Sequence, residues 1–205
     1  MPHPATINHS FLRHLVFWCL FLPSLMLVMV PLVWPNQSLD PAEVAMVSRW
    51  LDDVDAVTQA ANDHFTSWFD DTHLIAITRS FLHPAKPASP LWDVRPDWSA
   101  DWIDAFWAML YRAIWRWMAL KSMLLAPVLV LASAALIDGF TVRARKTYRF
   151  EAAHPGLYYA AMHGVMLILG MTCFLPLAPL VLTPWMLGAM VATITVALWL
   201  LAANR

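Results

Sequence analysis

Long uncharged runs alternate with an acid-rich polar segment along this chain, and the alternation predicts its architecture. Residues 11–34 read FLRHLVFWCLFLPSLMLVMVPLVW, and no charged residue occurs in the twenty residues that begin at Leu15. About 20 apolar residues cross ~30 Å of hydrocarbon as a helix. Further uncharged runs occupy 122–137, 160–175 and 185–202. The pattern predicts an all-α, polytopic membrane helix bundle with four transmembrane helices.

The first uncharged run admits two interpretations. A cleaved signal peptide has an apolar region of about 7 to 15 residues that ends at small residues. This run is longer and ends in Val-Pro-Leu-Val-Trp-Pro, which favours a retained anchor. We therefore expect residues 1–34 to form a short cytoplasmic stub and the first span, kinked at Pro23 and Pro31.

A basic cluster between the second and third uncharged runs predicts the orientation of the chain. Residues 138–154 read DGFTVRARKTYRFEAAH. The four cations of this basic cluster are Arg143, Arg145, Lys146 and Arg149. Lysine and arginine beside a span are retained on the cytoplasmic side. We expect a basic cytoplasmic loop over 138–159, with both termini cytoplasmic and residues 35–100 on the other side of the membrane.

The ends and contacts of the inner spans follow from small residues. Asp138–Gly139 is predicted as the turn that closes the second span, because glycine readily adopts the left-handed conformation found at helix ends. The third and fourth spans are expected within 160–205. Gly188 and Ala192 fit the spacing that lets membrane helices approach closely.

Negative charge is concentrated in one segment. Residues 35–105 carry twelve of the fourteen acidic residues against four basic ones, a formal charge of −8, whereas the whole chain has −1. Binding to nucleic-acid phosphates requires positive charge, so this segment is not a direct nucleic-acid partner. A proline-rich stretch at 83–96 predicts an extended or turning connection back to the membrane.

The acidic segment also predicts a helix that begins near Asp40-Pro41. Apolar residues recur there at steps of three and four, a pattern typical of an amphipathic helix or of a broken pair of helices. These residues are Val44, Val47, Leu51, Val54, Ala61, Phe65, Trp68 and Ile75. The apolar stripe either packs on the protein's own neighbouring segments or the membrane surface, or forms an extracytoplasmic arm for a partner.

Residues 101–137 are predicted as an interfacial segment followed by the second span. Aromatic and basic side chains alternate at its start, as expected at the headgroup level. The predicted interfacial anchors are Trp102, Trp107, Arg112, Trp115, Arg116 and Trp117, with Tyr158 and Tyr159 at the third span. The arginines are expected to reach lipid phosphates. The alternatives are pairing with the acids of the outer segment, of which Asp101 and Asp104 are nearest, or lining an ion path.

The residues that commonly perform catalysis do not form a recognisable constellation. Cys19 and Cys173 lie within apolar runs and are expected to be small buried hydrophobic residues. The spacing of His64 and His73 does not match a metal motif. His163 lies inside the third span and is expected to bond a neighbouring helix. We therefore expect no enzyme activity, cofactor, metal site or small-molecule substrate.

One layout resembles a known family. A span ends at Asp138-Gly139, the basic cluster and Glu151 follow, and Tyr158-Tyr159 opens the next span before a proline-interrupted pair of apolar runs. This order is similar to that of the DUF4400 membrane proteins of integrating conjugative elements, although those proteins often carry Tyr-His at the tyrosine pair. The resemblance implies a component of the bacterial inner membrane encoded with a conjugative type IV secretion apparatus.

The leading functional hypothesis is a non-catalytic subunit or adaptor of a DNA-transfer machine. Its acidic outer segment and its basic loop, with Glu151, would bind other membrane proteins, a coupling ATPase being one candidate. The basic cluster would also attract anionic membrane lipids, and a homo-oligomer is a further option. The alternatives are a small transporter or enzyme subunit, or an entry-exclusion protein, unrelated to the transfer machine.

Overall fold

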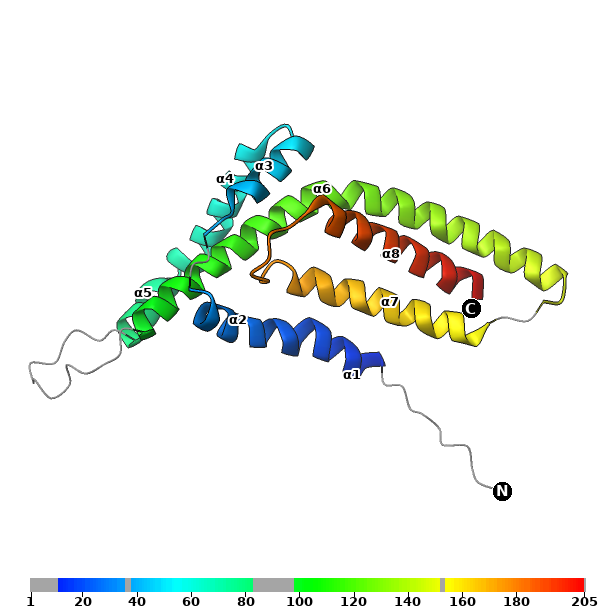
Figure 1. Ribbon diagram of the computed structural model, residues 1–205, viewed down its shortest axis with the longest axis horizontal. Helices are drawn as coiled ribbons and strands as arrows, with labels where there is room; N and C mark the ends of the chain where they lie inside the picture. The colour runs from blue at the N-terminus through cyan, green and yellow to red at the C-terminus, as the bar shows by residue number, and fades with distance from the viewer. Residues whose placement is uncertain (1–10, 36–37, 83–97, 152–153, 205) are drawn as a thin grey trace, which may run out of the picture.

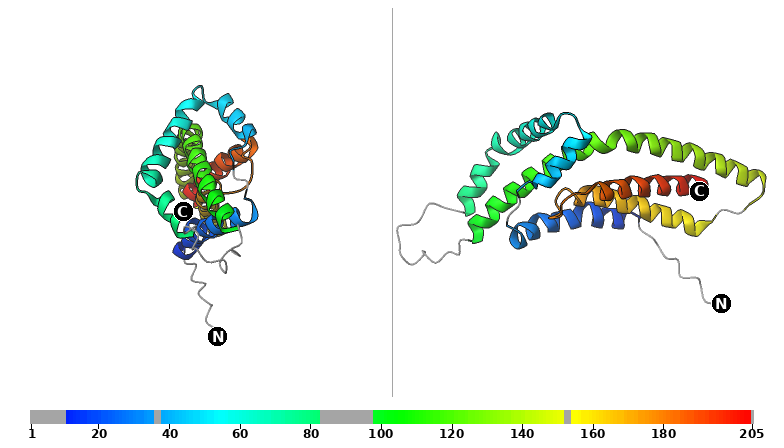
Figure 2. Two further views of the ribbon diagram at one scale, coloured as in Figure 1. Left: turned by 90° about the vertical axis from the view of Figure 1, so that its left-hand side faces the viewer. Right: turned by 45° about the horizontal axis from the view of Figure 1, so that its top comes forward.

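The computed structural model describes residues 11–35, 38–82, 98–151 and 154–204, and all regular structure within them is helical. The helices lie side by side in an elongated bundle with a bent central helix, α6 (Figures 1 and 2). Four helical runs are long and apolar enough to cross a membrane. These are Leu12–Val33, Asp101–Tyr148, Pro155–Phe174 and Pro184–Asn204. The four predicted spans are therefore present as helices.

The first span consists of α1 (Phe11–Val16), a π-helical turn η1 (Phe17–Phe21) and α2 (Leu22–Val33). The π-helical turn lies immediately before Pro23, which cannot donate a backbone hydrogen bond. The wider turn instead lets the Leu22 amide bond the Phe17 carbonyl. The span therefore passes the proline without a break between the helical segments.

The outer region contains three short α-helices, α3 (Pro41–Trp50), α4 (Val54–Phe65) and α5 (Leu74–Leu82), with a π-helical turn η2 (Thr66–Asp70) after α4. Asp40 caps α3 by accepting from the Ala42 amide at 2.8 Å, and Asp53 caps α4 by accepting from the Ala56 amide at 2.8 Å. Of the two alternatives predicted for this region, one continuous helix or a broken pair, the structure has the interrupted form, with three α-helices. The connection predicted at 83–96 lies outside the described residues.

The helix α6 (Trp98–Tyr148) is the longest element, with 51 residues. At 1.5 Å per residue it is about 76 Å long, more than twice the ~30 Å hydrocarbon thickness. The prediction that Asp138–Gly139 closes the second span is wrong, because α6 continues for nine residues beyond Gly139 and no described glycine has a positive φ. Three cations of the basic cluster are therefore helical rather than part of a loop.

The helix α6 ends at Tyr148, and Phe150 belongs to its C-terminal cap. This residue has a φ of 54°, and its amide bonds the Thr147 carbonyl while the Glu151 amide bonds the Lys146 carbonyl. The two bonds form a Schellman motif, in which the left-handed residue is usually glycine. The left-handed cap that was expected at Gly139 is thus formed eleven residues later, by the exposed Phe150.

Gly139 and Asp138 instead hold α6 against α8 (Pro184–Asn204). A Cβ on Gly139 would lie 2.7 Å from the Ala202 Cβ and 2.8 Å from the Trp199 carbonyl oxygen, so only glycine permits this approach. The Trp199 indole donates to the Asp138 carboxylate at 2.7 Å. Gly139 therefore allows α6 and α8 to approach closely, and Asp138 adds a hydrogen bond between the two helices.

The remaining inner helix, α7 (Pro155–Phe174), packs against α8 and against the first span. Gly170 touches Trp18 of η1, where an added Cβ would lie 2.8 Å from the Trp18 Cβ. Gly188, from the predicted close-packing pair, has no heavy atom of the described residues within 4 Å of an added Cβ. The glycines that mediate close contacts among the described residues are therefore Gly139, Gly164 and Gly170, whereas Gly188 faces open space.

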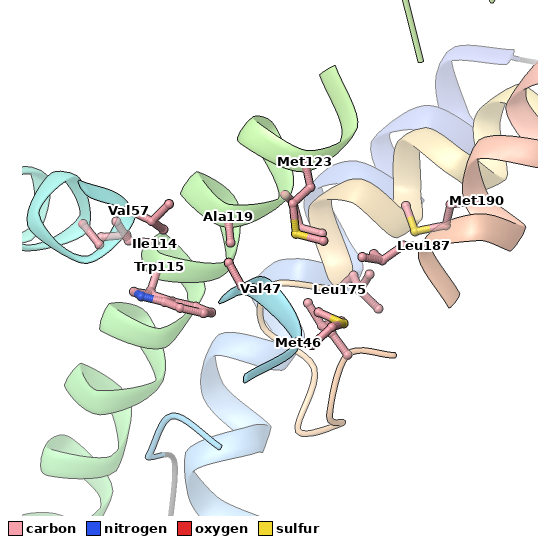
Figure 3. Packing of buried hydrophobic residues seen from close by; sticks show 13 residues of the cluster. Met46, Val47, Val57, Ile114, Trp115, Ala119, Met123, Leu175, Leu187 and Met190 are labelled. Atoms are coloured by element: carbon pink, nitrogen blue, oxygen red, sulfur yellow. The ribbon is translucent and has the colours of Figure 1, made fainter. Parts of the chain in front are cut away.

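The main core joins the outer helices to the inner bundle (Figure 3). Met46 and Val47 of α3 and Val57 of α4 meet the middle of α6 near Trp115. Leu175 of the α7–α8 loop completes the cluster. Six of the eight residues of the predicted apolar stripe therefore pack in or against this cluster, whereas Trp68 is 53% exposed.

Candidate functional site: a buried arginine–glutamate clamp

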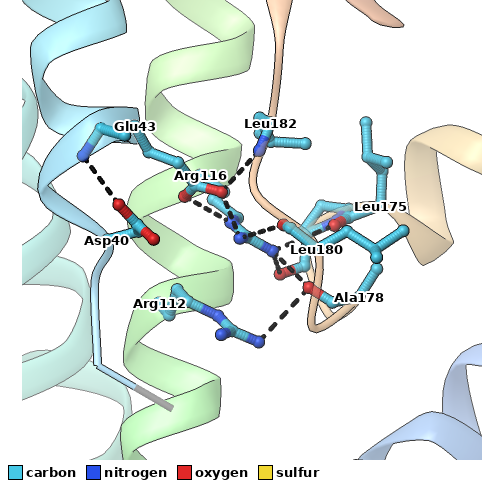
Figure 4. A network of polar contacts seen from close by, with 10 residues as sticks. Asp40, Glu43, Arg112, Arg116, Leu175, Ala178, Leu180 and Leu182 are labelled. Atoms are coloured by element: carbon cyan, nitrogen blue, oxygen red, sulfur yellow. Dashed lines mark hydrogen bonds and ion pairs between the residues drawn. The ribbon is translucent and has the colours of Figure 1, made fainter.

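Three segments distant in sequence meet at a buried ion pair (Figure 4). Glu43 lies in the first turn of α3 and Arg116 near the middle of α6. Their side chains are only 1% and 2% exposed. The α7–α8 loop, residues 175–183, covers the pair from the third side. We refer to Glu43, Arg116 and the loop groups that bond them as the clamp.

The guanidinium of Arg116 forms a bidentate pair with Glu43. Its Nε donates to Oε2 at 2.9 Å, and its Nη2 donates to Oε1. The planar guanidinium fork matches a carboxylate in this geometry, which lysine cannot reproduce. Arg116 therefore fixes the orientation of α3 relative to α6.

Loop carbonyl groups accept the other donors of Arg116. Nη1 donates to the Ala178 oxygen at 2.6 Å, with longer bonds of 3.3 and 3.4 Å to Pro176 and Leu175, and Nη2 donates to the Leu180 oxygen at 2.6 Å. The Leu182 amide donates to the Glu43 carboxylate at 2.7 Å. Prolines leave carbonyl groups in this loop without helical partners, so the clamp also satisfies its backbone.

The neighbouring Arg112 is buried but poorly satisfied. Its side chain is 6% exposed overall, and its Nη2 donates to the Ala178 oxygen at 3.4 Å. Its buried Nε atom has no hydrogen-bond partner among the described residues. Two guanidinium groups therefore share one carbonyl oxygen at this junction, opposite a single carboxylate.

Hydrogen bonds extend from the clamp along one face of α6. Trp115 donates to the Thr58 hydroxyl at 3.1 Å, and Tyr111 donates to the Asn62 side-chain oxygen at 2.7 Å. One and two turns further out, Trp107 donates to the Thr78 hydroxyl at 3.2 Å and Asp104 pairs with Arg79 at 2.8 Å. These four contacts, the polar zipper, run antiparallel between α6 and the helices α4 and α5.

A family comparison identifies the class of protein that carries this arrangement. The model of a family described as IncC plasmid conjugative DNA transfer protein DtrJ-like matches residues 36–204. The chain belongs to the DtrJ-like family. The searches of curated proteins and of solved structures found no match. Membership in the DtrJ-like family supports a part in conjugative DNA transfer, the setting implied by the DUF4400 resemblance.

In this DtrJ-like chain, four of the predicted interfacial anchors are wrongly placed. Trp107 and Trp115 are 7% and 2% exposed and belong to the polar zipper, and Arg112 and Arg116 are equally buried. The arginines do not reach lipid phosphates, because loop carbonyls and the remote Glu43 surround them. Asp104, one of their expected partners, is paired with Arg79 instead.

The other aromatic anchors lie nearer the surface. Trp117 is 46% exposed and Tyr159 is 53% exposed, whereas Tyr158 and Trp102 are half-buried. The Trp102 indole donates to the Val28 carbonyl of α2 at 3.1 Å, so Trp102 also ties α6 to the first span. Their placement at a membrane interface stays a prediction.

The DtrJ-like chain separates the members of its basic cluster. Arg143, Arg145 and Arg149 are exposed. Lys146 is half-buried and donates to the Asn204 side chain at 3.0 Å, which holds the end of α8. Arg149 lies 3.9 Å from Glu151 in an exposed pair, a contact of small energetic value. The exposed surface of the cluster is therefore carried by the three arginines.

The cysteine and histidine pairs of this DtrJ-like chain lie between the first span and α7. Cys19 and Cys173 are both free and half-buried, and their thiols are within hydrogen-bonding reach. The rings of His14 and His163 are 5.9 Å apart, and His163 also contacts the Tyr159 carbonyl of its own helix at 2.8 Å. No group of three metal-ligating side chains occurs within the described residues.

Glu43 is the clamp residue of this DtrJ-like chain that the sequence did not single out, although pairing of the arginines with acids of the outer segment was one alternative. Its position in the first turn of a helix is already explained by the helix dipole, so its sequence context gives no sign of a partner 73 residues away. The available signal was the pair Arg112 and Arg116, which lie one turn apart in a span and require an anion or carbonyl groups near them.

Proposed function

We propose that this protein is a non-catalytic inner-membrane subunit of a conjugative type IV secretion apparatus, with one partner on each side of the membrane. The observation that carries the proposal is the continuity of α6. This single helix of 51 residues bears the outer helices at one end and the exposed arginines at the other. Partners at its two ends are therefore connected through one covalent element.

The outer surface would bind its partner through acidic residues. The apolar faces of α3 and α4 and the polar zipper are occupied by α6, so the face left exposed is rich in carboxylates. The exposed acids are Asp52, Asp53, Asp55, Asp63, Asp70 and Asp71. A partner with a basic surface would be complementary to this face and would associate faster for that reason.

The inner surface would bind its partner through arginines and aromatic rings. Arg143, Arg145 and Arg149 are exposed, and Tyr148 and Phe150 beside them are 87% and 97% exposed. Arginine and aromatic residues are enriched in protein–protein interfaces, and arginine pairs well with carboxylates. A cytoplasmic partner with an acidic patch, such as a coupling ATPase, fits this chemistry.

The test changes Arg143, Arg145 and Arg149 together to glutamine and leaves Lys146 intact, because Lys146 holds α8. Tagged wild-type and variant proteins are recovered from solubilised donor membranes, and their partners are compared together with the transfer frequency. We expect the variant to insert normally, to lose a cytoplasmic partner and to reduce transfer.

A matched variant changes Asp52, Asp53 and Asp55 to asparagine and should lose a different, outer partner. Cysteines introduced at positions 55 and 145 should be labelled from opposite sides of the membrane. Unchanged partners in both variants, or labelling from one side, would overturn the proposal.

A further inference from the structure

An apolar groove lies on the inner bundle where three helices meet. In Figure 1, α8 lies between α6 and α7, and it packs against both. The groove has a volume of about 330 Å³ and is lined by side chains of all three helices. Leu125 and Val128 of α6, Leu169 of α7 and Val191 of α8 are among its apolar lining residues.

Lys121 is the one charged residue that lines this groove. It is exposed, and no hydrogen bond or ion pair joins it to any described residue. An ammonium group beside an apolar groove in a membrane helix requires an anion or water for its charge. The groove therefore combines an apolar floor with an unpaired cation at its edge.

The position of Lys121 along α6 corresponds to a membrane surface. Twenty-two residues separate it from Arg143, and this distance along the helix is about 33 Å. A hydrocarbon layer is ~30 Å thick. When the exposed arginines lie at one surface, Lys121 lies at the headgroup level of the other, and the groove extends from it toward the bilayer interior.

A second groove between α6 and α8 provides an internal comparison. It is lined by Ala134, Thr195 and Val196, and the charged residue beside it is Asp138. Asp138 accepts a bond from Trp199, and its negative charge repels phosphate. Both grooves are lined by α6 and α8, the first by α7 as well, and they differ in the sign of the charge at their edges.

We propose that the groove beside Lys121 binds one anionic diacyl phospholipid. The phosphate pairs with the Lys121 ammonium, and one acyl chain lies along Val128 and Val191. Basic pockets between membrane helices bind anionic headgroups in this way. The site is distinct from the partner surfaces proposed above, since neither the exposed acids nor the exposed arginines line it.

The test is native mass spectrometry of the full chain, purified in detergent and incubated with phosphatidylglycerol or phosphatidylcholine of the same acyl composition. We expect the wild-type chain to retain one phosphatidylglycerol in preference to phosphatidylcholine. Lys121→Gln should reduce phosphatidylglycerol retention by about five-fold, the equivalent of one cation near a lipid surface. Lys121→Arg should keep the retention.

Two further variants separate the groove from the charge. Val128→Trp fills the groove beside Lys121 and should reduce retention of both lipids, whereas Ala134→Trp fills the groove beside Asp138 and should leave both unchanged. Circular dichroism and size-exclusion chromatography establish that each variant is folded. Equal retention of the two lipids by the wild-type chain, or full retention by Lys121→Gln, would overturn the proposal.

Discussion

The two halves of α6 are held by different physical means. The outer half, up to Arg116, adds side-chain hydrogen bonds and a buried ion pair to its apolar contacts. The inner half contacts α8 through close packing at Gly139 and apolar side chains, with hydrogen bonds of Asp138 and Lys146 near its end. Lipid is as apolar as leucine, so helices in a membrane associate through close fit rather than through the hydrophobic effect. The helix α6 therefore has its buried ion pair and most of its polar contacts in the outer half, and its closest backbone packing in the inner half.

The difference suits the proposed roles of the two halves. Polar contacts with exact donor and acceptor pairs fix α3–α5 in one orientation, which an outer binding surface requires. The contacts of the inner half set the distance between α6 and α8 and leave two grooves open beside α8. Predictions that perturb each half separately test whether the two modes are independent.

The largest effect is expected from breaking the clamp. Glu43→Ala leaves the buried Arg116 charge without its carboxylate, which should lower the free energy of unfolding by about 3 to 5 kcal/mol. Denaturant titration in detergent micelles, followed by tryptophan fluorescence, measures this loss. The double variant Glu43→Leu/Arg116→Met removes both charges and should recover part of the loss, because the Ala178 and Leu180 carbonyls and the Leu182 amide still lose their partners.

The control for the clamp is Asp104→Ala. It removes the pair with Arg79, whose side chains are 55% and 64% exposed, and should cost at most about 1 kcal/mol. A loss in Glu43→Ala no greater than that in Asp104→Ala would show that the buried pair does not hold the outer helices.

A smaller effect is expected from Gly139→Leu in the inner half. The new Cβ would approach Ala202 and the Trp199 carbonyl to under 3 Å, so α6 and α8 must move apart, at a cost of about 1 to 3 kcal/mol. Gly188→Leu is the matched control, since nothing described lies near its added Cβ, and should change stability by about 0.5 kcal/mol or less. Equal losses in the same micelle titration would argue against the close approach at Gly139.

The smallest effect is expected from single bonds of the polar zipper. Thr58→Val removes the acceptor of the Trp115 indole and should cost about 1 kcal/mol, because a buried donor is left unpaired. A double-mutant cycle with Trp115→Phe measures the bond itself, with an expected coupling of about 1 kcal/mol. Additive losses would show that the two side chains do not interact.

Much of the inner fold could be predicted from the sequence, because membrane helices are encoded by local composition. The uncharged runs predicted the four helices. Where kinks were expected, a π-helical turn precedes Pro23, and Pro31 lies inside the α-helix α2. The helix end predicted at Asp138–Gly139 was wrong, because a glycine can either end a helix or let two helices pack closely. The distinction depends on Ala202, which lies more than 60 residues away.

The candidate site could be predicted only in part. Arg112 and Arg116 were recognisable as cations that needed an explanation, but their partner depends on how α3 folds back onto α6. Amphipathic spacing predicted that the outer helices present an apolar stripe, and Val47 and Ala61 are indeed buried. It could not show that Trp107 and Trp115 donate to threonines of those helices rather than to lipid headgroups.

The proline within α6 has a mechanical consequence. Pro127 lies near the middle of the helix, which is bent in Figures 1 and 2, and a proline removes one backbone hydrogen bond and favours a kink. On either side of it the two arms of α6 are firmly braced, one by the clamp and the other by α8. Bending of α6 is therefore expected to be concentrated at Pro127, where it would change the angle between the arm that carries α3–α5 and the arm that packs on α8.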